Sequence, residues 1–327
     1  MNAFKGCLVV LICLLLFVTY FPGQSAAKYP EKSITIVCPW AAGGMAFLMA
    51  MELGNEMEKI LGKRVLVVSQ TGGAGAAGTT YVKQAPADGY TLFQAWIAPF
   101  VMVPLQNPQI GYDPLKDFTL LAYMTENPVV ALAQKDSPYN TLKEFVDYVR
   151  ANPGKFFKFG GGPTLSVHSL FGNEVFRNVG VKVQGVYYVD SGAPMLDLVG
   201  KTLDVSFHTF EALKKFPTIK ALGVFSEKRY PEFPDVPTVL EQGLKAPTVK
   251  SWSGIAAPKG IPPDVRDYLV ETIKKILQDP KFQQKIFNNM NQFVVYHGPE
   301  GFGEIIRRDM EQMKGPVQRA GEMEKKK

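Results

Sequence analysis

The chain has 327 residues, of which 46% are hydrophobic and 20% charged, so it is too long for one ordinary domain and too apolar to be mostly disordered. Its net charge of +6 at pH 7 is spread along the chain, and the longest run of basic residues is the terminal segment 325–327. Nucleic-acid-binding proteins usually carry a clustered basic stripe, so we expect no nucleic-acid partner.

The first 27 residues have the layout of a signal peptide. Lys5 precedes an uncharged apolar run over residues 7–20, and the small residues Ser25, Ala26 and Ala27 follow. The run is shorter than the roughly 20 residues that a membrane-spanning helix needs. We therefore expect residues 1–27 to be removed by cleavage near Ala27 and the mature protein to be exported. An uncleaved membrane anchor is the alternative.

Cleavage would leave Cys38 as the only cysteine, which excludes an internal disulfide. Cys38 ends an apolar, strand-like run, so we expect a buried side chain rather than a reactive thiol, with a redox role as the alternative. The three histidines, His168, His208 and His297, lack the spacing of metal ligands. The residues suggest no catalytic group, no metal and no cofactor.

Short β-rich runs alternate with helical patterns, which is typical of an α/β fold with mostly parallel sheets. Helices are expected over Met45–Leu61, after the capping box formed by Thr141 and Glu144, from Pro262 and from Pro299. The tail 315–327 is polar and is expected to be frayed. Strands are expected at residues 33–38, 65–68, 91–96, 129–133, 156–159, 183–189, 204–207, 221–224 and 249–252.

Two segments of the chain resemble crossings between lobes. Pro128 opens a new strand near residues 125–130, and Pro247 precedes another near residues 246–253. Two crossings imply a discontinuous first lobe, because the chain leaves it and later returns. We expect a leader over residues 1–27, a first lobe over 28–127 plus 250–327, and a second lobe over 128–249.

Three glycine-rich turns follow predicted strands, at residues 39–44, 71–78 and 160–166. Each turn should leave the first N–H groups of the next helix unpaired and uncovered by bulky side chains. Such N–H groups and the positive end of the helix dipole together bind anions without Lys or Arg. Three such turns at strand ends favour a ligand site at the carboxyl edge of the sheets, although each turn alone could be a tight turn and nothing more.

The second turn also fits the dinucleotide-binding pattern through Gly73, Gly75 and Gly78. A dinucleotide-dependent enzyme is therefore the alternative function. The acidic residue expected about 20 residues further on is missing, since positions 94–104 hold no Asp or Glu.

These turns and their flanking motifs resemble the periplasmic substrate-binding proteins of tripartite tricarboxylate transporters, the Bug-type receptors. The similarity extends over essentially the whole mature chain. Its most specific motifs are Asp88-Gly-Tyr-Thr-Leu92 and Pro234-Asp-Val-Pro-Thr238. The others are Tyr29-Pro30, Pro39-Trp40 with Gly43-Gly44, the turn 71–78, Ala85-Pro86, Tyr112-Asp113-Pro114, Lys116-Asp117-Phe118, Asn152-Pro153-Gly154, Glu241-Gln-Gly243, and Trp252 before Ala257-Pro258-Lys-Gly260.

The resemblance implies a type II periplasmic-binding fold, with two lobes and a cleft between them that holds an organic anion, usually a di- or tricarboxylate or an aromatic acid. It also implies a monomeric, non-enzymatic receptor that delivers this anion to transporter subunits in the membrane or to a sensor. The first lobe would contribute Trp40, Ala42, Gly43, Gly44, Thr71, Gly72, Gly73, Ala74 and Gly75. The second would contribute Thr164, Ser166, His168, Asp190, Ser191 and Gly192, with His208 also facing the cleft.

Phe47 departs from the family pattern, because many members carry an Asp three residues past the paired glycines. That Asp can bind a cationic group of the ligand, so its absence disfavours an amino acid. Phe47 with Trp40 suggests a more apolar, aromatic acid, and the alternative is that Phe47 belongs to the core.

Overall fold

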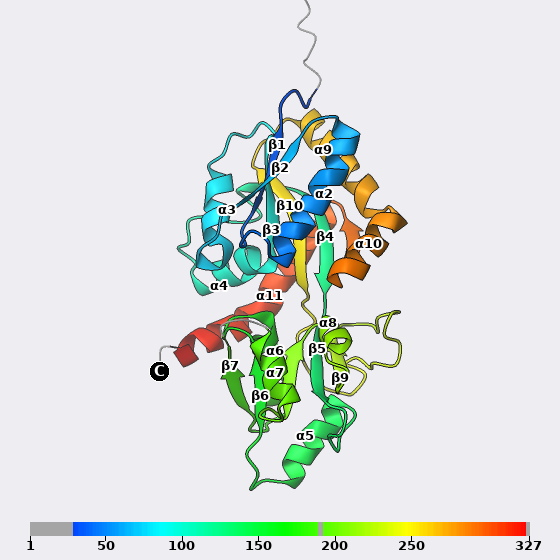
Figure 1. Ribbon diagram of the computed structural model, residues 1–327. Helices are drawn as coiled ribbons and strands as arrows, with labels where there is room; N and C mark the ends of the chain where they lie inside the picture. The colour runs from blue at the N-terminus through cyan, green and yellow to red at the C-terminus, as the bar shows by residue number, and fades with distance from the viewer. Residues whose placement is uncertain (1–28, 189–191, 325–327) are drawn as a thin grey trace, which may run out of the picture.

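The computed structural model describes residues 29–188 and 192–324 and consists of two lobes, each built on one β-sheet flanked by helices (Figure 1). The two-lobed α/β architecture predicted from the sequence is thereby confirmed. The predicted leader, 1–27, and two predicted site residues, Asp190 and Ser191, lie outside the described residues.

The sheet of the first lobe has six strands in the order β11-β4-β10-β3-β1-β2. β1 is parallel to β2 and β3, whereas β10 is antiparallel to β3 and β4, and β11 is antiparallel to β4. The strands are β1 (Ile34–Cys38), β2 (Val65–Ser69), β3 (Thr91–Trp96), β4 (Phe118–Asn127), β10 (Ser251–Pro258) and β11 (Phe293–His297).

The sheet of the second lobe has five strands in the order β7-β6-β8-β5-β9. β6 is parallel to β7 and β8, and β5 is antiparallel to β8 and β9. Both sheets are thus mixed, which corrects the expectation of mostly parallel sheets: the strands next to the crossings, β5 and β10, run against their neighbours. The strands are β5 (Val129–Gln134), β6 (Lys158–Gly161), β7 (Gln184–Tyr187), β8 (Val205–His208) and β9 (Ile219–Phe225).

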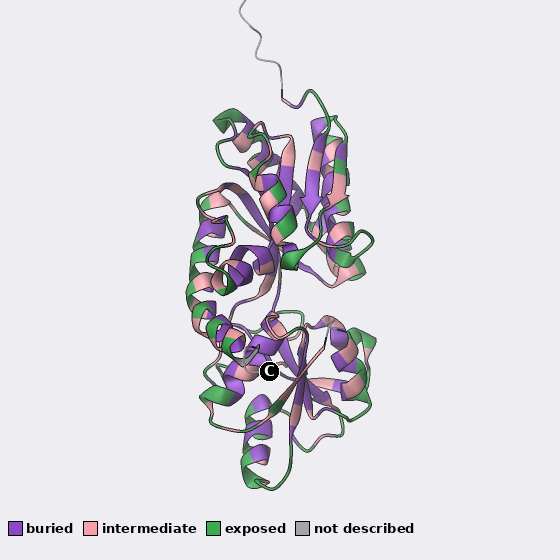
Figure 2. Cartoon of the chain, turned by 90° about the vertical axis from the view of Figure 1, so that its left-hand side faces the viewer, coloured by how far each residue is buried: buried purple, intermediate pink, exposed green. Residues whose placement is uncertain are grey.

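The helices cover the faces of both sheets, and buried residues concentrate in the strands between them (Figure 2). The Thr141 hydroxyl accepts a hydrogen bond from the Glu144 N–H, as the capping motif predicts. The helices are α2 (Met45–Leu61), η1 (Gly73–Gly75), α3 (Ala76–Lys83), η2 (Ala98–Met102), α4 (Val103–Gln106), α5 (Leu142–Ala151), α6 (Val167–Asn178), α7 (Ala193–Val199), α8 (Glu211–Lys215), α9 (Pro263–Leu277), α10 (Pro280–Met290) and α11 (Pro299–Glu324).

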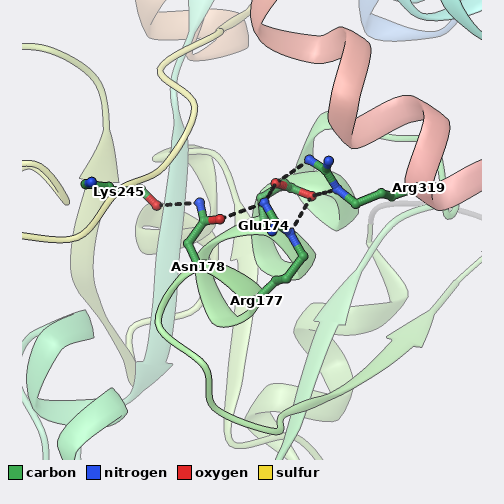
Figure 3. A network of polar contacts seen from close by, with 5 residues as sticks. All are labelled: Glu174, Arg177, Asn178, Lys245 and Arg319. Atoms are coloured by element: carbon green, nitrogen blue, oxygen red, sulfur yellow. Dashed lines mark hydrogen bonds and ion pairs between the residues drawn. The ribbon is translucent and has the colours of Figure 1, made fainter.

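The last helix, α11, continues through the segment that was expected to fray. Val317 and Ala320 are each 1% exposed, because the helix passes from the first lobe onto α6 of the second (Figure 1). There the Arg319 guanidinium donates to both carboxylate oxygens of the buried Glu174 at 2.9 and 2.7 Å (Figure 3). Tertiary contacts thus keep this polar segment helical, and the prediction of a frayed tail was wrong up to Glu324.

Candidate functional site

The directions of the strands place the predicted site residues at the facing edges of the two sheets. β4 leads into β5 through Pro128, so β4 runs toward the second lobe. β10 is antiparallel to both β4 and β3, so β3, β1 and β2 run the same way as β4. In the second lobe β8 is antiparallel to β5 and parallel to β6, and β6 is parallel to β7, so all three run back toward the first lobe. The carboxyl ends of β1, β2, β3, β6, β7 and β8 therefore lie where the lobes face each other (Figure 1).

The turn after β1 presents an uncapped helix start at this edge. Ala42, Gly43 and Gly44 are exposed, and Gly43 has φ +81°, a conformation that favours glycine. Gly44 is the N-cap of α2 and no side chain caps the helix there. Because α2 has 17 residues and no acid in its first turn, its N-terminus carries a positive partial charge that suits an anion.

The turn after β2 is built from four consecutive residues with positive φ: Gly72 (129°), Gly73 (55°), Ala74 (52°) and Gly75 (93°). Residues 71–74 are exposed, and no side chain caps α3. This backbone is accessible at the same edge as the start of α2.

Packing explains two of the three glycines in the dinucleotide-like pattern. A Cβ on Gly75 would lie 3.0 Å from Pro99, and a Cβ on Gly78 would lie 2.8 Å from the carbonyl oxygen of Gln70. The close packing of Gly75 against the Pro99 side chain and of Gly78 against the Gln70 backbone accounts for these glycines without a bound nucleotide.

Aromatic side chains border the first turn. The Trp40 ring meets the Trp96 ring edge to face, with centroids 6.4 Å apart, and both contact the core beneath α2. Phe47 is half-buried against the same core, so it belongs in part to the packing. Trp96 was not among the predicted site residues, although its position at the carboxyl end of β3 was a usable signal.

The turn in the second lobe differs from the prediction of an uncapped helix. Ser166 is the N-cap of α6, and its hydroxyl oxygen accepts a hydrogen bond from the Ser169 N–H at 3.3 Å. A Cβ on Gly161 would lie 2.4 Å from the Ser169 hydroxyl oxygen, so that glycine makes room for the cap. Thr164 is half-buried beside it. The Ser166 hydroxyl therefore caps the start of α6, and the Ser-x-x-Ser spacing was the sequence signal that the prediction overlooked.

His168 and His208 come together at the same edge from α6 and β8. Their rings stack with centroids 5.6 Å apart and an interplanar angle of 21°. His168 Nε2 is buried without a hydrogen-bond partner among the described residues. Burial, and to a lesser degree the neighbouring His208, lowers the pKa of His168 to about 3, so its imidazole is neutral at physiological pH. The last described residue predicted here, Gly192, is exposed at the start of α7.

Two cavities of the structure lie away from these residues. One of about 650 Å³ lies on the second lobe between α5 and α6, and one of about 360 Å³ lies beside the crossings, next to Glu126, Tyr230 and Lys250. The predicted residues are thus grouped within each lobe but do not line these cavities.

Residues 29–188 and 192–324 contain neither a metal-binding cluster nor a membrane-spanning helix. Within these ranges no three His, Cys, Asp or Glu side chains are placed to hold a metal ion. No helix there combines the length and the apolar character that crossing a membrane requires. Cys38 is fully buried, and burial raises the pKa of its thiol, as expected for a structural cysteine.

The chain is similar in sequence to known receptors and their relatives. Residues 49–319 match the tripartite tricarboxylate transporter family receptor, TctC. The UPF0065 protein in the TAR-I ttuE-ttuC' intergenic region of Agrobacterium vitis is 33% identical over 82% of this chain and 79% of its own length. Protein BugT of Bordetella pertussis is 26% identical over 91% of this chain and 92% of its own.

Solved structures share the fold. A TctC solute-binding protein from Polaromonas, solved without ligand, superposes with a TM-score of 0.78 at 24% identity, covering 89% of this chain and all of that one. MatC from Rhodopseudomonas palustris, solved with bound malate, gives a TM-score of 0.70 at 26% identity, covering 88% of this chain and all of that one.

Fold and sequence together define a two-lobed solute-binding protein. The chain belongs to the tripartite tricarboxylate transporter receptor family, which includes the Bug-type proteins, as the sequence motifs predicted. This is a family of receptors rather than enzymes, and the dinucleotide-dependent alternative finds no support in it.

Proposed function

We propose that this protein is a periplasmic receptor that captures a small organic carboxylate between its two lobes and delivers it to a membrane transporter. The observation that carries the proposal is the uncapped start of α2 at the edge facing the second lobe. An anion placed there is bound by main-chain N–H groups and by the helix dipole. The malate-bound relative supports a carboxylate as the ligand class.

Capture requires the lobes to approach each other by rotation at the crossings. We place the lobe boundaries at 127/128 and 249/250, so that the first lobe comprises 28–127 plus 250–327 and the second comprises 128–249. Glu126, just before the first crossing, accepts hydrogen bonds from Lys250, just before β10, and from the Tyr230 hydroxyl at 3.0 Å. These contacts tie the two crossing segments together, and the lobes would close about them.

The ligand contacts come from both lobes. The backbone of residues 42–44 and 71–75, which is exposed except at Gly75, contributes from the first lobe, with Trp40 and Phe47 as apolar neighbours. The Ser166 hydroxyl is engaged in capping α6. The second lobe would contribute the other predicted residues, which are Thr164, His168, Asp190, Ser191, Gly192 and His208. The apolar side chains favour an acid with an aromatic or aliphatic body, and the lack of an acid at position 47 disfavours an amino acid.

Location and partners complete the proposal. Residues 1–27 act as a cleaved signal peptide, and the mature chain acts as a monomer without catalysis. Its partners are membrane subunits of the tripartite tricarboxylate type or a sensor in the same membrane.

The experiment is a thermal-shift screen of the mature protein against di- and tricarboxylates, aromatic acids, amino acids and NAD. A ligand that binds only the folded state raises Tm by mass action. At 100 times its Kd it adds about 2.7 kcal/mol to the free energy of unfolding. We expect one or a few carboxylates to raise Tm, with amino acids and NAD inactive. Stabilisation by NAD and by no carboxylate would overturn the receptor proposal.

A further inference from the structure

Trp96 carries a buried donor without an acceptor at the edge that faces the second lobe. It is the last residue of β3, its side chain is 9% exposed, and no described group accepts a hydrogen bond from its indole Nε1–H. Buried N–H groups are nearly always hydrogen-bonded in folded proteins, because leaving one unpaired lowers stability. This donor is therefore available for a partner that the chain itself does not supply.

The position of Trp96 relative to α2 follows from its neighbour on the same face of β3. Alternate residues of a strand point to the same face, and Gln94 on that face donates through Nε2 to the carbonyl oxygen of Ala46 at 3.0 Å. Two residues on, Trp96 lies roughly 7 Å further along the strand, at the level of the start of α2. Trp40 packs edge to face against it at 6.4 Å, which confirms that the indole lies beside the turn before α2.

The charges around this point suit an anion. The first turn of α2 holds no acidic residue, and its N–H groups are not capped by any side chain. The first acid along α2 is Glu52, which is paired with Lys285 of α10. Helix-start N–H groups without a side-chain cap and an indole N–H without an acceptor thus lie at the same edge, with no carboxylate of the first turn to compete for them.

We propose that the Trp96 indole N–H and the uncapped N–H groups at the start of α2 form one carboxylate subsite, which the Trp40–Trp96 pair makes selective for acids with a flat apolar body. This proposal deepens the receptor function proposed above and rests on it for the physiological ligand. The carboxylate oxygens accept from the indole and from the helix start, while the two rings contact the body of the ligand.

The test uses the three indole N–H signals of the mature protein, which belong to Trp40, Trp96 and Trp252. With Trp labelled with 15N at the indole nitrogen, each signal is assigned by single Trp-to-Phe variants and followed by NMR. The probes are benzoate, acetate, which lacks the flat body, and benzamide, which lacks the charge. Trp252 is the internal control, because its Nε1 already donates to Asp309 at 2.7 Å.

We expect benzoate to move the Trp96 signal downfield, acetate to move it only at higher concentration, benzamide to leave it in place, and Trp252 to stay fixed throughout. W96F should weaken benzoate binding roughly 10- to 100-fold, the effect of losing one hydrogen bond to a charged group. A Trp96 signal that ignores both carboxylates, or that moves equally with benzamide, would overturn the subsite. If carboxylates raise Tm in the screen while this signal stays fixed, the receptor function stands and the subsite fails. If no carboxylate raises Tm and the signal stays fixed, both fail.

Discussion

The two edges that face each other present different chemistry. At the edge of the first lobe, α2 begins at Gly44 without a capping side chain, and the backbone of residues 71–74 is exposed. At the edge of the second lobe, Ser166 caps α6, and the neutral His168 stacks on His208. The first lobe thus offers main-chain donors to a negative charge, whereas the second has a side-chain cap at the start of α6 and the neutral imidazole of His168. The comparison suggests that the first lobe binds the carboxylate and the second lobe completes the enclosure.

Adding a side chain beside the exposed backbone at the edge of the first lobe should have the largest effect on ligand affinity. Gly43 and Gly62 flank the two ends of α2, with φ of +81° and +66°, and a Cβ on either would meet no atom within 4 Å. Gly43→Val and Gly62→Val should each cost about 1–2 kcal/mol of unfolding free energy, because a branched residue is strained at positive φ.

Only Gly43→Val should also impair ligand binding, since Gly43 lies at the facing edge and Gly62 at the far end of the helix. We expect the affinity for the acid that stabilises the unaltered protein most to fall at least about tenfold in Gly43→Val, the equivalent of one charge-assisted hydrogen bond, and to stay unchanged in Gly62→Val. Calorimetric titration measures both. Equal affinities in the two variants would show that the start of α2 takes no part in binding.

The neutral character of the second edge predicts a dependence of stability on pH. The pKa of His168 is lowered from 6.5 to about 3 in the folded state, so the unfolded chain binds more protons between these values. This contribution to stability is complete above pH 6.5 and is lost as the pH falls toward 3. The loss of unfolding free energy between pH 7 and pH 5 should amount to about 2 kcal/mol at most.

Urea unfolding at the two pH values should therefore show a smaller loss of stability in His168→Gln than in the unaltered protein. His297→Gln is the matched control, because His297 is exposed at the end of β11. The assignment to His168 fails if His168→Gln keeps the full loss of stability, or if His297→Gln removes it.

Much of the fold was accessible from the sequence because local signals agreed with the tertiary structure. Met45–Leu61 and the cap at Thr141 were predicted residue for residue, and the predicted strands agree with observed ones to within a few residues. Strands β4 and β11 and helix α10 were missed, although β4 lies inside the first sheet, between β11 and β10. β4 has no alternation of apolar and polar residues, since most of its residues are buried on both faces.

The part of the candidate site that is formed by backbone could be predicted from the sequence. The glycines after β1 and β2 predicted exposed backbone at the helix starts. In the structure this exposed backbone lies at one edge of the first lobe. Contacts between distant side chains gave no sequence signal: the stacking of His168 on His208 and of Trp96 against Trp40 joins residues at least 40 positions apart. Such contacts depend on the order and direction of the strands, which the sequence predicted only in part.

Helix α11 connects the two lobes, and breaking its contact with α6 should have a smaller effect on stability. Arg319 joins α11 to Glu174 of α6, and Glu174 keeps Arg177 as a second partner at 2.7 Å if Arg319 is removed (Figure 3). Arg319→Met should therefore cost about 1–2 kcal/mol, less than the 3–5 kcal/mol of an acid left fully unpaired in the core. Arg307→Met, exposed on the same helix, should cost under about 0.5 kcal/mol in urea unfolding. Similar losses in both variants would mean that the pair with Glu174 does not anchor the end of α11.

Removing the cap at Ser166 should have the smallest effect on stability, and it tests whether the two edges differ in how they bind the ligand. Ser166→Ala should remove the hydrogen bond to Ser169 and cost about 1 kcal/mol of unfolding free energy, and Thr141→Ala at the start of α5 should cost the same. Neither change should alter carboxylate affinity by more than about threefold, because the first lobe binds the charge. Ser166→Asp keeps a capping oxygen but adds a negative charge at the facing edge. It should therefore preserve the free energy of unfolding and lower the affinity for the carboxylate by charge repulsion. A tenfold loss of affinity in Ser166→Ala, with Thr141→Ala unaffected, would instead make the Ser166 hydroxyl a ligand contact and remove the distinction between the two edges.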